Sequence, residues 1–234
     1  MSKGGRAVGR SGGRGGRANR RTDGPTNQRI SARDVPILHV VTDEAIAQLP
    51  DLAQRARAVA AAGAIALHAR GPGLSGRAHL DLARTLGTAV QGTESRLFVN
   101  DRLDVARIVR AFGLHLPSAG LPVAEARRLL DKRAVIGRSV HSAEEARRAH
   151  AEGADYVFLG PIWETRSHPG ATPLGLEVIA QAAPARVIAI GGITPERARA
   201  CRAAGAYGVA AISAVWGASD PGGAARALLL SLKV

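Results

Sequence analysis

The sequence has a single cysteine, Cys201, and few aromatic residues, which make up 3% of the chain. One cysteine cannot form an intrachain disulfide, so a fold stapled by disulfides is excluded. No apolar run reaches the roughly 18 residues that a membrane-spanning helix needs, so no membrane partner is expected. The basic N-terminus is not followed by the apolar segment of a secretory signal. A cytoplasmic protein is the simplest interpretation.

Acidic residues are almost absent from residues 1–33, which contain nine lysines or arginines and one acid, Asp23. This segment carries a net charge of +8 of the chain's +13, which leaves +5 for the remainder. It is rich in glycine and arginine and has too few apolar residues to offset its ordering entropy. Residues 1–35 are therefore expected to be a disordered tail, and residues 36–234 the folded domain. The tail has no aromatic residue to stack on bases, which argues against a nucleic-acid partner.

From Pro36 onward, short apolar runs alternate with helical patterns. Eight strands are predicted, at residues 37–41, 64–69, 96–99, 113–116, 134–139, 155–159, 186–190 and 207–212. Eight helices are predicted, at residues 48–62, 76–90, 101–111, 122–132, 142–152, 174–182, 195–204 and 221–232. This alternation is typical of a single α/β domain, a (β/α)8 TIM barrel. An open doubly wound sheet is the alternative, although such sheets more often have about five or six strands.

Reactive groups of a TIM barrel lie at the carboxyl ends of its strands. This rule selects the polar residues at the predicted strand ends, which include Arg70, Asn100, Asp101, His115, Ser139, His141 and Thr165. His79 and His150 fall within predicted helices and are expected to face solvent. The rule therefore separates histidines that belong to a site from histidines on the surface.

The stretch IGRSVHS, residues 136–142, joins a buried strand to a helix. Ser142 and Glu145 have the spacing of a capping box, which starts the helix. His141 precedes the cap, at the mouth of the barrel, where an imidazole would be available for acid–base chemistry near neutral pH. Arg138 is one position from Ser139 and is expected on the opposite side of the strand.

The phrase AIGGIT, residues 189–194, ends a strand with two glycines and begins a helix at Thr194. Glycines let the backbone approach an anion, and phosphate sites of this fold commonly use the loops after strands seven and eight. A phosphate site is therefore expected from Gly191, Gly192, Ala211, Ile212 and Ser213. The alternative is a tight turn that needs only the flexibility of glycine.

The segment GPIWETRSHPGATPLG, residues 160–175, is too polar and too rich in proline and glycine to be a helix. It is predicted to be a long loop after the sixth strand, where binding loops often occur. Arg166 and His168 are candidates for contact with an anionic substrate. A solvated loop is the alternative.

Several phrases of the barrel, in order, resemble the thiamine phosphate synthase superfamily. They are VTD (41–43), NDR (100–102), HLP (115–117), GADYVFLGPIWET (153–165), AIGGIT (189–194) and GVAAISAV (208–215). The resemblance covers residues 37–231. It implies one of two activities: a synthase that joins a thiazole phosphate to a hydroxymethylpyrimidine diphosphate, or a metal-free tautomerase that aromatises a thiazole carboxylate phosphate.

Three phrases depart from the synthase pattern. Where synthases have Q-x-R-x-K, H-L-G-Q-x-D and T-x-T-K, this chain has LHARGPG, HLPSAG (115–120) and TRSH (165–168), so two lysines and one aspartate are missing. Arg70 is retained. The phrases HLPS, IGRSVHS and WET resemble the tautomerase, in which the residue matching His141 transfers the proton. The resemblance therefore favours a thiazole tautomerase without a cofactor.

Under this interpretation His141 is the catalytic residue, and the substrate-binding residues are Arg70, Asn100, Ser139 and Thr165. A thiamine phosphate synthase is the first alternative, in which Asp101 would bind magnesium; Asp101 is otherwise read as the N-cap of the third helix. The second alternative is an inert phosphate-binding barrel with a regulatory role. The oligomeric state stays open, and a homo-oligomer is compatible with the sequence.

Overall fold

The computed structural model describes Met1 and residues 35–131, 133–165 and 170–233. Eight parallel strands close into a barrel in sequence order, and β1 pairs with β8 to complete it. The strands are β1 (Leu38–Val41), β2 (Ile65–Ala69), β3 (Arg96–Asn100), β4 (Gly113–Leu116), β5 (Val135–Val140), β6 (Tyr156–Leu159), β7 (Val187–Ile190) and β8 (Gly208–Ala211). The predicted TIM barrel is confirmed. The predicted disordered tail, residues 1–35, lies outside the described residues except for Met1 and the buried Val35.

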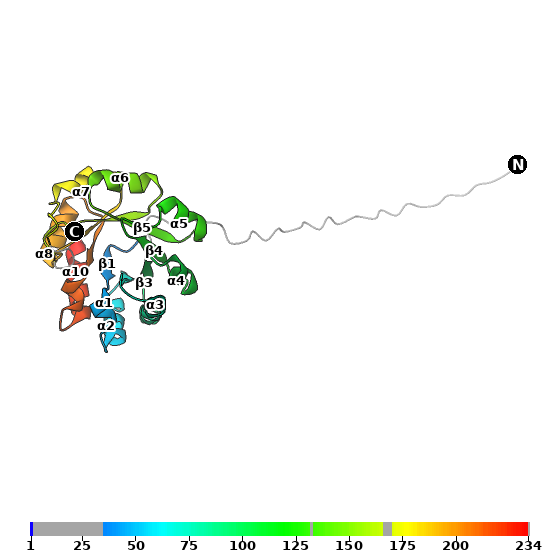
Figure 1. Ribbon diagram of the computed structural model, residues 1–234, viewed down its shortest axis with the longest axis horizontal. Helices are drawn as coiled ribbons and strands as arrows, with labels where there is room; N and C mark the ends of the chain where they lie inside the picture. The colour runs from blue at the N-terminus through cyan, green and yellow to red at the C-terminus, as the bar shows by residue number, and fades with distance from the viewer. Residues whose placement is uncertain (2–34, 132, 166–169, 234) are drawn as a thin grey trace.

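Helices surround the barrel (Figure 1). They are α1 (Glu44–Ala47), α2 (Leu52–Ala60), α3 (Gly76–Val90), α4 (Leu103–Ile108), α5 (Val123–Leu129), α6 (Ala143–Ala151), α7 (Glu177–Gln181), α8 (Pro195–Ala203), α9 (Ser213–Trp216) and α10 (Pro221–Leu232). The short helices α1 and α9 follow β1 and β8 and were not predicted, because four residues are too few to show helical periodicity. In the described part of the chain, no helix is both long and apolar enough to cross a membrane.

The helix starts follow local chemistry. The Ser142 side chain accepts a hydrogen bond from the Glu145 N–H at the start of α6. Thr194 caps α8 in the same way, with Pro195 at the first helical position. Both caps satisfy N–H groups that have no partner within the helix, which confirms the predicted helix starts.

Aromatic side chains fill much of the barrel interior. Phe98, Tyr156 and Phe158 lie in it with Ile188, all at most 3% exposed. Gly137 of β5 makes room for one ring, since a Cβ there would lie 2.2 Å from Cζ of Tyr156. The chain's few aromatic residues are thus concentrated where they fill most volume. A separate apolar layer packs between the strands and the helices.

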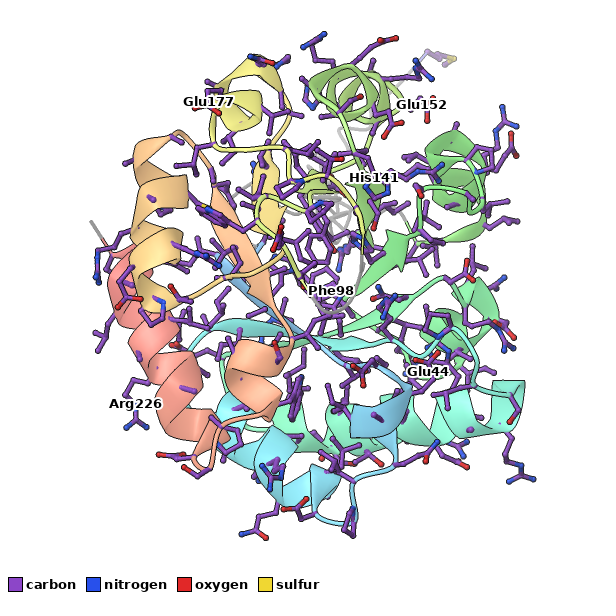
Figure 2. All side chains as sticks on the ribbon, turned by 60° about the vertical axis from the view of Figure 1, so that its left-hand side comes forward. Glu44, Phe98, His141, Glu152, Glu177 and Arg226 are labelled. Atoms are coloured by element: carbon purple, nitrogen blue, oxygen red, sulfur yellow. The ribbon has the colours of Figure 1, made fainter. Side chains whose placement is uncertain are left out.

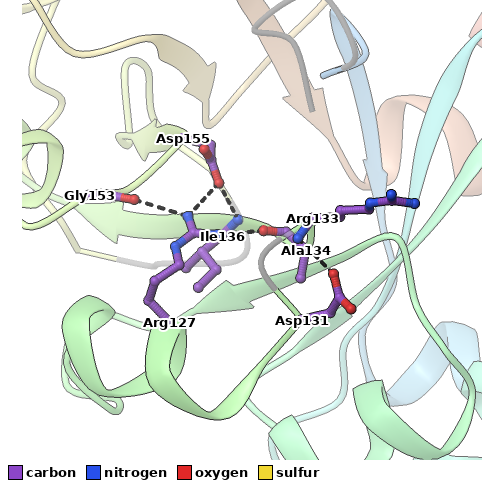
Figure 3. A network of polar contacts seen from close by, with 7 residues as sticks. All are labelled: Arg127, Asp131, Arg133, Ala134, Ile136, Gly153 and Asp155. Carbon is purple, nitrogen blue, oxygen red and sulfur yellow. Dashed lines mark hydrogen bonds and ion pairs between the residues drawn. The ribbon is translucent and has the colours of Figure 1, made fainter. Parts of the chain in front are cut away.

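At the amino-terminal end of the strands, Arg127 of α5 ties two neighbouring turns together (Figure 3). Its guanidinium donates to the carbonyl oxygens of Ala134 and Gly153 and to the Asp155 carboxylate. Asp155 also accepts from the Ile136 N–H at 2.7 Å. This polar network joins the turns that precede β5 and β6 at the end of the barrel opposite the carboxyl ends of the strands.

Candidate active site

One cavity of about 290 Å³ opens among the carboxyl ends of the strands. Its wall contains the predicted catalytic, substrate-binding and phosphate-binding residues and Asp101: Arg70, Asn100, Asp101, Ser139, His141, Thr165, Gly191, Gly192, Ala211, Ile212 and Ser213. His115, also expected at the mouth, is 1% exposed and does not line the cavity. Figure 2 labels His141 on this side of the barrel and Phe98 in its interior. The fold therefore brings together residues separated by up to 143 positions in the sequence, from Arg70 to Ser213.

Arg70 follows β2 directly, and its backbone is fixed by Thr42 at the end of β1. The Thr42 hydroxyl accepts from the Arg70 N–H at 2.9 Å and contacts the Arg70 carbonyl oxygen at 2.8 Å. Thr42 is fully buried, so these bonds are shielded from water. The pair holds the start of the β2–α3 loop and directs a cationic residue to the cavity wall.

Asp101 follows β3 in a left-handed backbone conformation, with a φ of 63°. This conformation is uncommon outside glycine and is often found at functional sites. The expected alternative role as a helix cap is wrong: Arg102 occupies the N-cap position of α4, and no side chain caps that helix. Among the described residues, no hydrogen-bond or ion-pair partner of the Asp101 carboxylate is found. The carboxylate therefore remains available to a ligand.

Arg102 adds a second cation to the cavity wall. It belongs to the phrase NDR, but its position after the strand end gave no sign that it lines the cavity. Its guanidinium forms a two-point contact with Asp104, at 2.9 and 2.5 Å. The hydrogen bond from Arg102 lowers the pKa of Asp104 to about 2. Asp104 thus holds the guanidinium at the edge of the cavity and partly neutralises it.

His141 lies on the cavity wall between β5 and α6. Its backbone N–H donates to the Glu145 carboxylate at 2.7 Å. Its ring Nδ1 is 2.7 Å from the carbonyl oxygen of Gly160, so Nδ1 carries the hydrogen. The ring is thereby tied to the loop after β6. Arg138 turns away as expected and donates to the carbonyl oxygens of Ser118 and Leu121.

The loops after β7 and β8 present backbone N–H groups to the cavity. Among the described residues, no hydrogen-bond acceptor is found for the N–H groups of Gly191, Gly192, Ile212 or Ser213. Gly192 has a φ of 65°, and a Cβ there would lie 2.8 Å from the Glu164 carbonyl oxygen. Glycine is therefore required, and the open amides are suited to an anion.

His79 was expected to face solvent, and this prediction is wrong. The side chain is 4% exposed and lines the cavity from α3. Its Nε2 donates to the Ala69 carbonyl oxygen at 3.0 Å. Burial lowers the pKa of His79, so the ring is neutral near pH 7. Helical position alone could not show which face of α3 packs on β2.

The cavity combines cations and open amides with one carboxylate, so it is suited to a phosphorylated ligand. In the described residues, no group of three or more histidine, cysteine or acidic side chains could hold a metal by itself. The candidates Arg166 and His168 lie outside the described residues. Ser118, also a polar residue at a predicted strand end, lines the cavity together with Pro161, which only the spatial closure of the barrel identifies.

The fold and cavity define a TIM-barrel protein whose mouth is lined by arginine side chains and open backbone amides. The chain belongs to the thiamine monophosphate synthase family, whose family model matches residues 38–215. This confirms the resemblance carried by the sequence phrases. Family membership places the chain among enzymes of thiamine biosynthesis.

Known proteins support this assignment. A thiamine-phosphate synthase of Methanoculleus marisnigri is 44% identical over 195 residues, which cover 82% of this chain and 92% of that protein. The bifunctional protein ThiM/ThiE of Symbiobacterium thermophilum is 49% identical over 156 residues, 65% of this chain but only 32% of that longer protein. A thiamine phosphate pyrophosphorylase structure from Pyrococcus furiosus superposes with a TM-score of 0.73 at 31% identity, covering 84% of this chain and 95% of that one.

The expectation of a thiazole tautomerase is wrong. Relatives that are 38–44% identical over most of their length are named thiamine-phosphate synthase. The expectation rested on three short phrases in which charged side chains are lost. Those losses do not define the reaction, because Arg70, Arg102 and the open backbone amides still supply positive potential at the mouth.

Proposed function

We propose that the chain is a thiamine-phosphate synthase, a transferase that joins a thiazole phosphate to hydroxymethylpyrimidine diphosphate. The bond between the pyrimidine methylene carbon and the diphosphate oxygen breaks, and its electron pair leaves with the diphosphate. The lone pair of the thiazole nitrogen forms the new carbon–nitrogen bond. The similarity to thiamine-phosphate synthases along nearly their whole length is the observation that carries this proposal.

The thiazole phosphate is assigned to the open amides of Gly191, Gly192, Ile212 and Ser213, with Ala211 beside them. Backbone N–H groups at fixed positions bind phosphate oxygens without reorganisation. This site leaves Arg70 and Arg102, on the β2 and β3 side of the cavity, for the diphosphate. The two anionic groups would thus occupy opposite walls, with the reacting carbon and nitrogen between them.

Magnesium is the cofactor this reaction implies, and Asp101 fits it as the one carboxylate among the described lining residues. Magnesium is usually held by about one or two carboxylates together with substrate phosphates and water. When bound, it supplies positive charge to the departing diphosphate. The strained backbone and unpaired carboxylate of Asp101 support this assignment.

Joining the two substrates moves no proton from carbon, so the general-base role expected of His141 has no place in it. His141 is assigned to the cavity wall, where its bond to Gly160 fixes the loop after β6. Asn100, Ser139 and Thr165 are assigned to substrate binding from their positions on the wall. The partners proposed are these small molecules, with no nucleic acid; a cytoplasmic location and a homo-oligomer stay predictions.

The test is direct coupling. Purified protein is incubated with both substrates and magnesium, and thiamine phosphate and pyrophosphate are measured. We expect equal amounts of the two products and loss of both when a chelator removes magnesium. The variant Arg70→Met should lose roughly 10²–10³-fold in rate, as removal of one charge-stabilising group typically does. Arg84→Met, on the exposed face of α3, is the matched control.

Two outcomes would contradict the proposal. Coupling that is no faster than without protein would exclude the synthase, and phosphate binding without coupling would favour the inert barrel. Either outcome would mean that the synthase activity was lost with the lysine and the aspartate that Pro72 and Gly120 replace in this chain.

A further inference from the structure

Three histidines are buried inside the barrel beneath the cavity. His39, His68 and His115 lie on β1, β2 and β4 and are at most 1% exposed. They pack among Phe98 and Phe158, and the ring of His68 is stacked on Phe98 at 4.9 Å. Buried imidazoles need hydrogen-bond partners, and these partners lead to the cavity wall.

The first chain of contacts runs from Pro36 to Asn100. His39 Nε2 is 2.9 Å from the Pro36 carbonyl oxygen, and His39 Nδ1 is 2.8 Å from His68 Nε2. His68 Nδ1 is 2.9 Å from the side-chain oxygen Oδ1 of Asn100 as the structure places it. Each contact requires one hydrogen, and the Pro36 oxygen can only accept.

The number of available hydrogens fixes the donor-to-acceptor direction along this series of hydrogen bonds. If Asn100 turned its oxygen toward His68, both ends would accept, and the two rings would share three hydrogens. Two neutral imidazoles have only two, so the pair would be a cation. If Asn100 turns its NH2 group toward His68, every hydrogen points toward Pro36 and both rings are neutral.

The environment selects the neutral pair. Burial lowers the pKa of His68 to about 3 and that of His39 well below its ordinary value. No described carboxylate contacts either ring. Amide nitrogen and oxygen are assigned from such networks, so the Asn100 amide is assigned with its NH2 toward His68, turned by half a rotation from the placement in which Oδ1 faces the ring. The oxygen then takes the position of the amide nitrogen, for which no described hydrogen-bond partner is found, on the cavity wall that Asn100 lines.

The second chain runs from Tyr156 to Ser139. His115 Nδ1 is 3.1 Å from the Tyr156 hydroxyl, and His115 Nε2 is 2.8 Å from the Ser139 hydroxyl. The buried Tyr156 hydroxyl has no other described partner, so its hydrogen must go to Nδ1. Nε2 then donates to Ser139, whose own hydroxyl hydrogen is left for the cavity.

We propose that His68, held by His39, is a positioning residue that turns the oxygen of Asn100 toward the cavity, and that His115 turns the hydroxyl hydrogen of Ser139 toward it. The barrel core thereby sets one acceptor and one donor on the cavity wall. A ligand must offer a hydrogen to Asn100 and an acceptor to Ser139. The proposal deepens the substrate assignment. It rests on the proposed function only for the identity of the substrate that these two groups recognise.

Nuclear magnetic resonance of protein labelled with 15N in its histidine rings tests the core without any turnover. We expect His39, His68 and His115 each to carry hydrogen on Nε2 and a bare Nδ1, unchanged between pH 5 and 8, about the range in which free histidine titrates. A hydrogen on Nδ1 of any of the three, or an imidazolium near pH 7, would overturn the assignment. Failure of the synthase reaction would leave this measurement unaffected.

The variant Asn100→Asp provides a second spectroscopic test. A carboxylate offers only acceptors, so the bare His68 Nδ1 would face an oxygen and must take up a proton. We expect imidazolium signals from His68 at pH 7 in Asn100→Asp and not in the parent protein. If Nδ1 of His68 already carried the hydrogen in the parent protein, it could donate to the new carboxylate without taking up a proton. Histidine signals that do not change in Asn100→Asp would therefore contradict the proposal.

Kinetics separate positioning from packing. His68→Gln can donate to His39 and accept from Asn100, so it should retain the KM for the pyrimidine diphosphate. His68→Phe fills the space without either bond and should raise that KM roughly 3- to 10-fold, the effect of one misplaced hydrogen bond. Phe98→Leu, which disturbs the same core without a polar contact, is the control. Equal KM shifts in His68→Phe and Phe98→Leu at matched stability loss would show that His68 only packs.

Discussion

Among single residues, Asp101 is unusual because its backbone is left-handed while its carboxylate lines the cavity. We expect Asp101→Asn to lower synthase activity roughly 10²–10³-fold, since the charge that would hold magnesium is removed. Stability should be unchanged or slightly higher, because asparagine accepts this backbone conformation well. Product formation and thermal unfolding are the measurements.

Asp81→Asn is the control for Asp101→Asn, because Asp81 is an exposed residue of α3. It should leave activity at the parent level. Equal activity of Asp101→Asn and Asp81→Asn across a range of magnesium concentrations would remove Asp101 from the site. A large loss of stability in Asp101→Asn would instead indicate a structural role.

At the scale of elements, the turn after β7 is constrained on both sides. Gly192 has a φ of 65°, and a Cβ there would lie 3.0 Å from the Cβ of Trp163 as well as close to Glu164. The Arg197 guanidinium donates to the Gly192 carbonyl oxygen at 2.7 Å and lies 5.0 Å from the Trp163 ring. The loops after β6 and β7 therefore support each other.

Gly192→Ala should force these loops apart and displace the open amides. We expect the affinity for thiazole phosphate to fall at least about tenfold, since each hydrogen bond to a charged group contributes roughly 1.5–3 kcal/mol. Calorimetric titration measures this affinity. Gly205→Ala is the matched control: its φ is 96°, but nothing lies within 4 Å of its Cβ position.

Gly205→Ala should cost about 1–2 kcal/mol of stability from the left-handed backbone alone and leave phosphate affinity intact. If the two variants bind phosphate equally well, the phosphate is held elsewhere in the mouth. The comparison thus separates backbone strain, which both variants share, from displacement of the site.

At the scale of the whole molecule, the buried histidines make the fold sensitive to acid. The folded-state pKa values of His39, His68 and His115 lie below those of the unfolded chain, with that of His68 at about 3. Their contribution to stability is therefore complete above the unfolded pKa of about 6.5 and decreases as the pH falls. Each ring that stays neutral in the folded chain lowers the free energy of unfolding by about 1.4 kcal/mol per pH unit below that value.

Urea unfolding at pH 7, 6 and 5 should show this loss, with a slope of roughly 4 kcal/mol per pH unit when all three rings contribute. His68→Gln removes one titrating group and should reduce the slope by about a third. A stability that is constant over this range would mean that the rings are not held neutral in the folded chain.

The boundary of the domain is a further whole-molecule prediction. The described barrel is anchored from Val35, which is 3% exposed and whose carbonyl oxygen accepts from the Tyr207 hydroxyl at 2.7 Å. A chain that begins at Val35 should therefore unfold at the same temperature and keep its activity. A drop of more than a few degrees would assign a structural role to the Gly/Arg-rich segment.

The sequence by itself determined the strands, most helices and the end of the barrel at which the cavity opens. Strand and helix patterns, and caps such as Ser142 and Thr194, depend on residues only a few positions apart. The parallel alternation then implied the barrel, and the barrel implied that Arg70, Asn100 and Ser139 would meet at its mouth. These are consequences of local periodicity and of one topological rule.

Only the tertiary structure decided which polar groups contact one another. His39 and His68 are 29 positions apart and touch because β1 and β2 pair in register. His79 is buried because its face of α3 packs toward β2, and Asp101 is not a cap because the chain turns left-handed before α4 begins. Such contacts depend on strand register and on which helix face packs inward. Both are settled when the whole barrel closes, because burial and hydrogen bonding must be satisfied by all eight strands together.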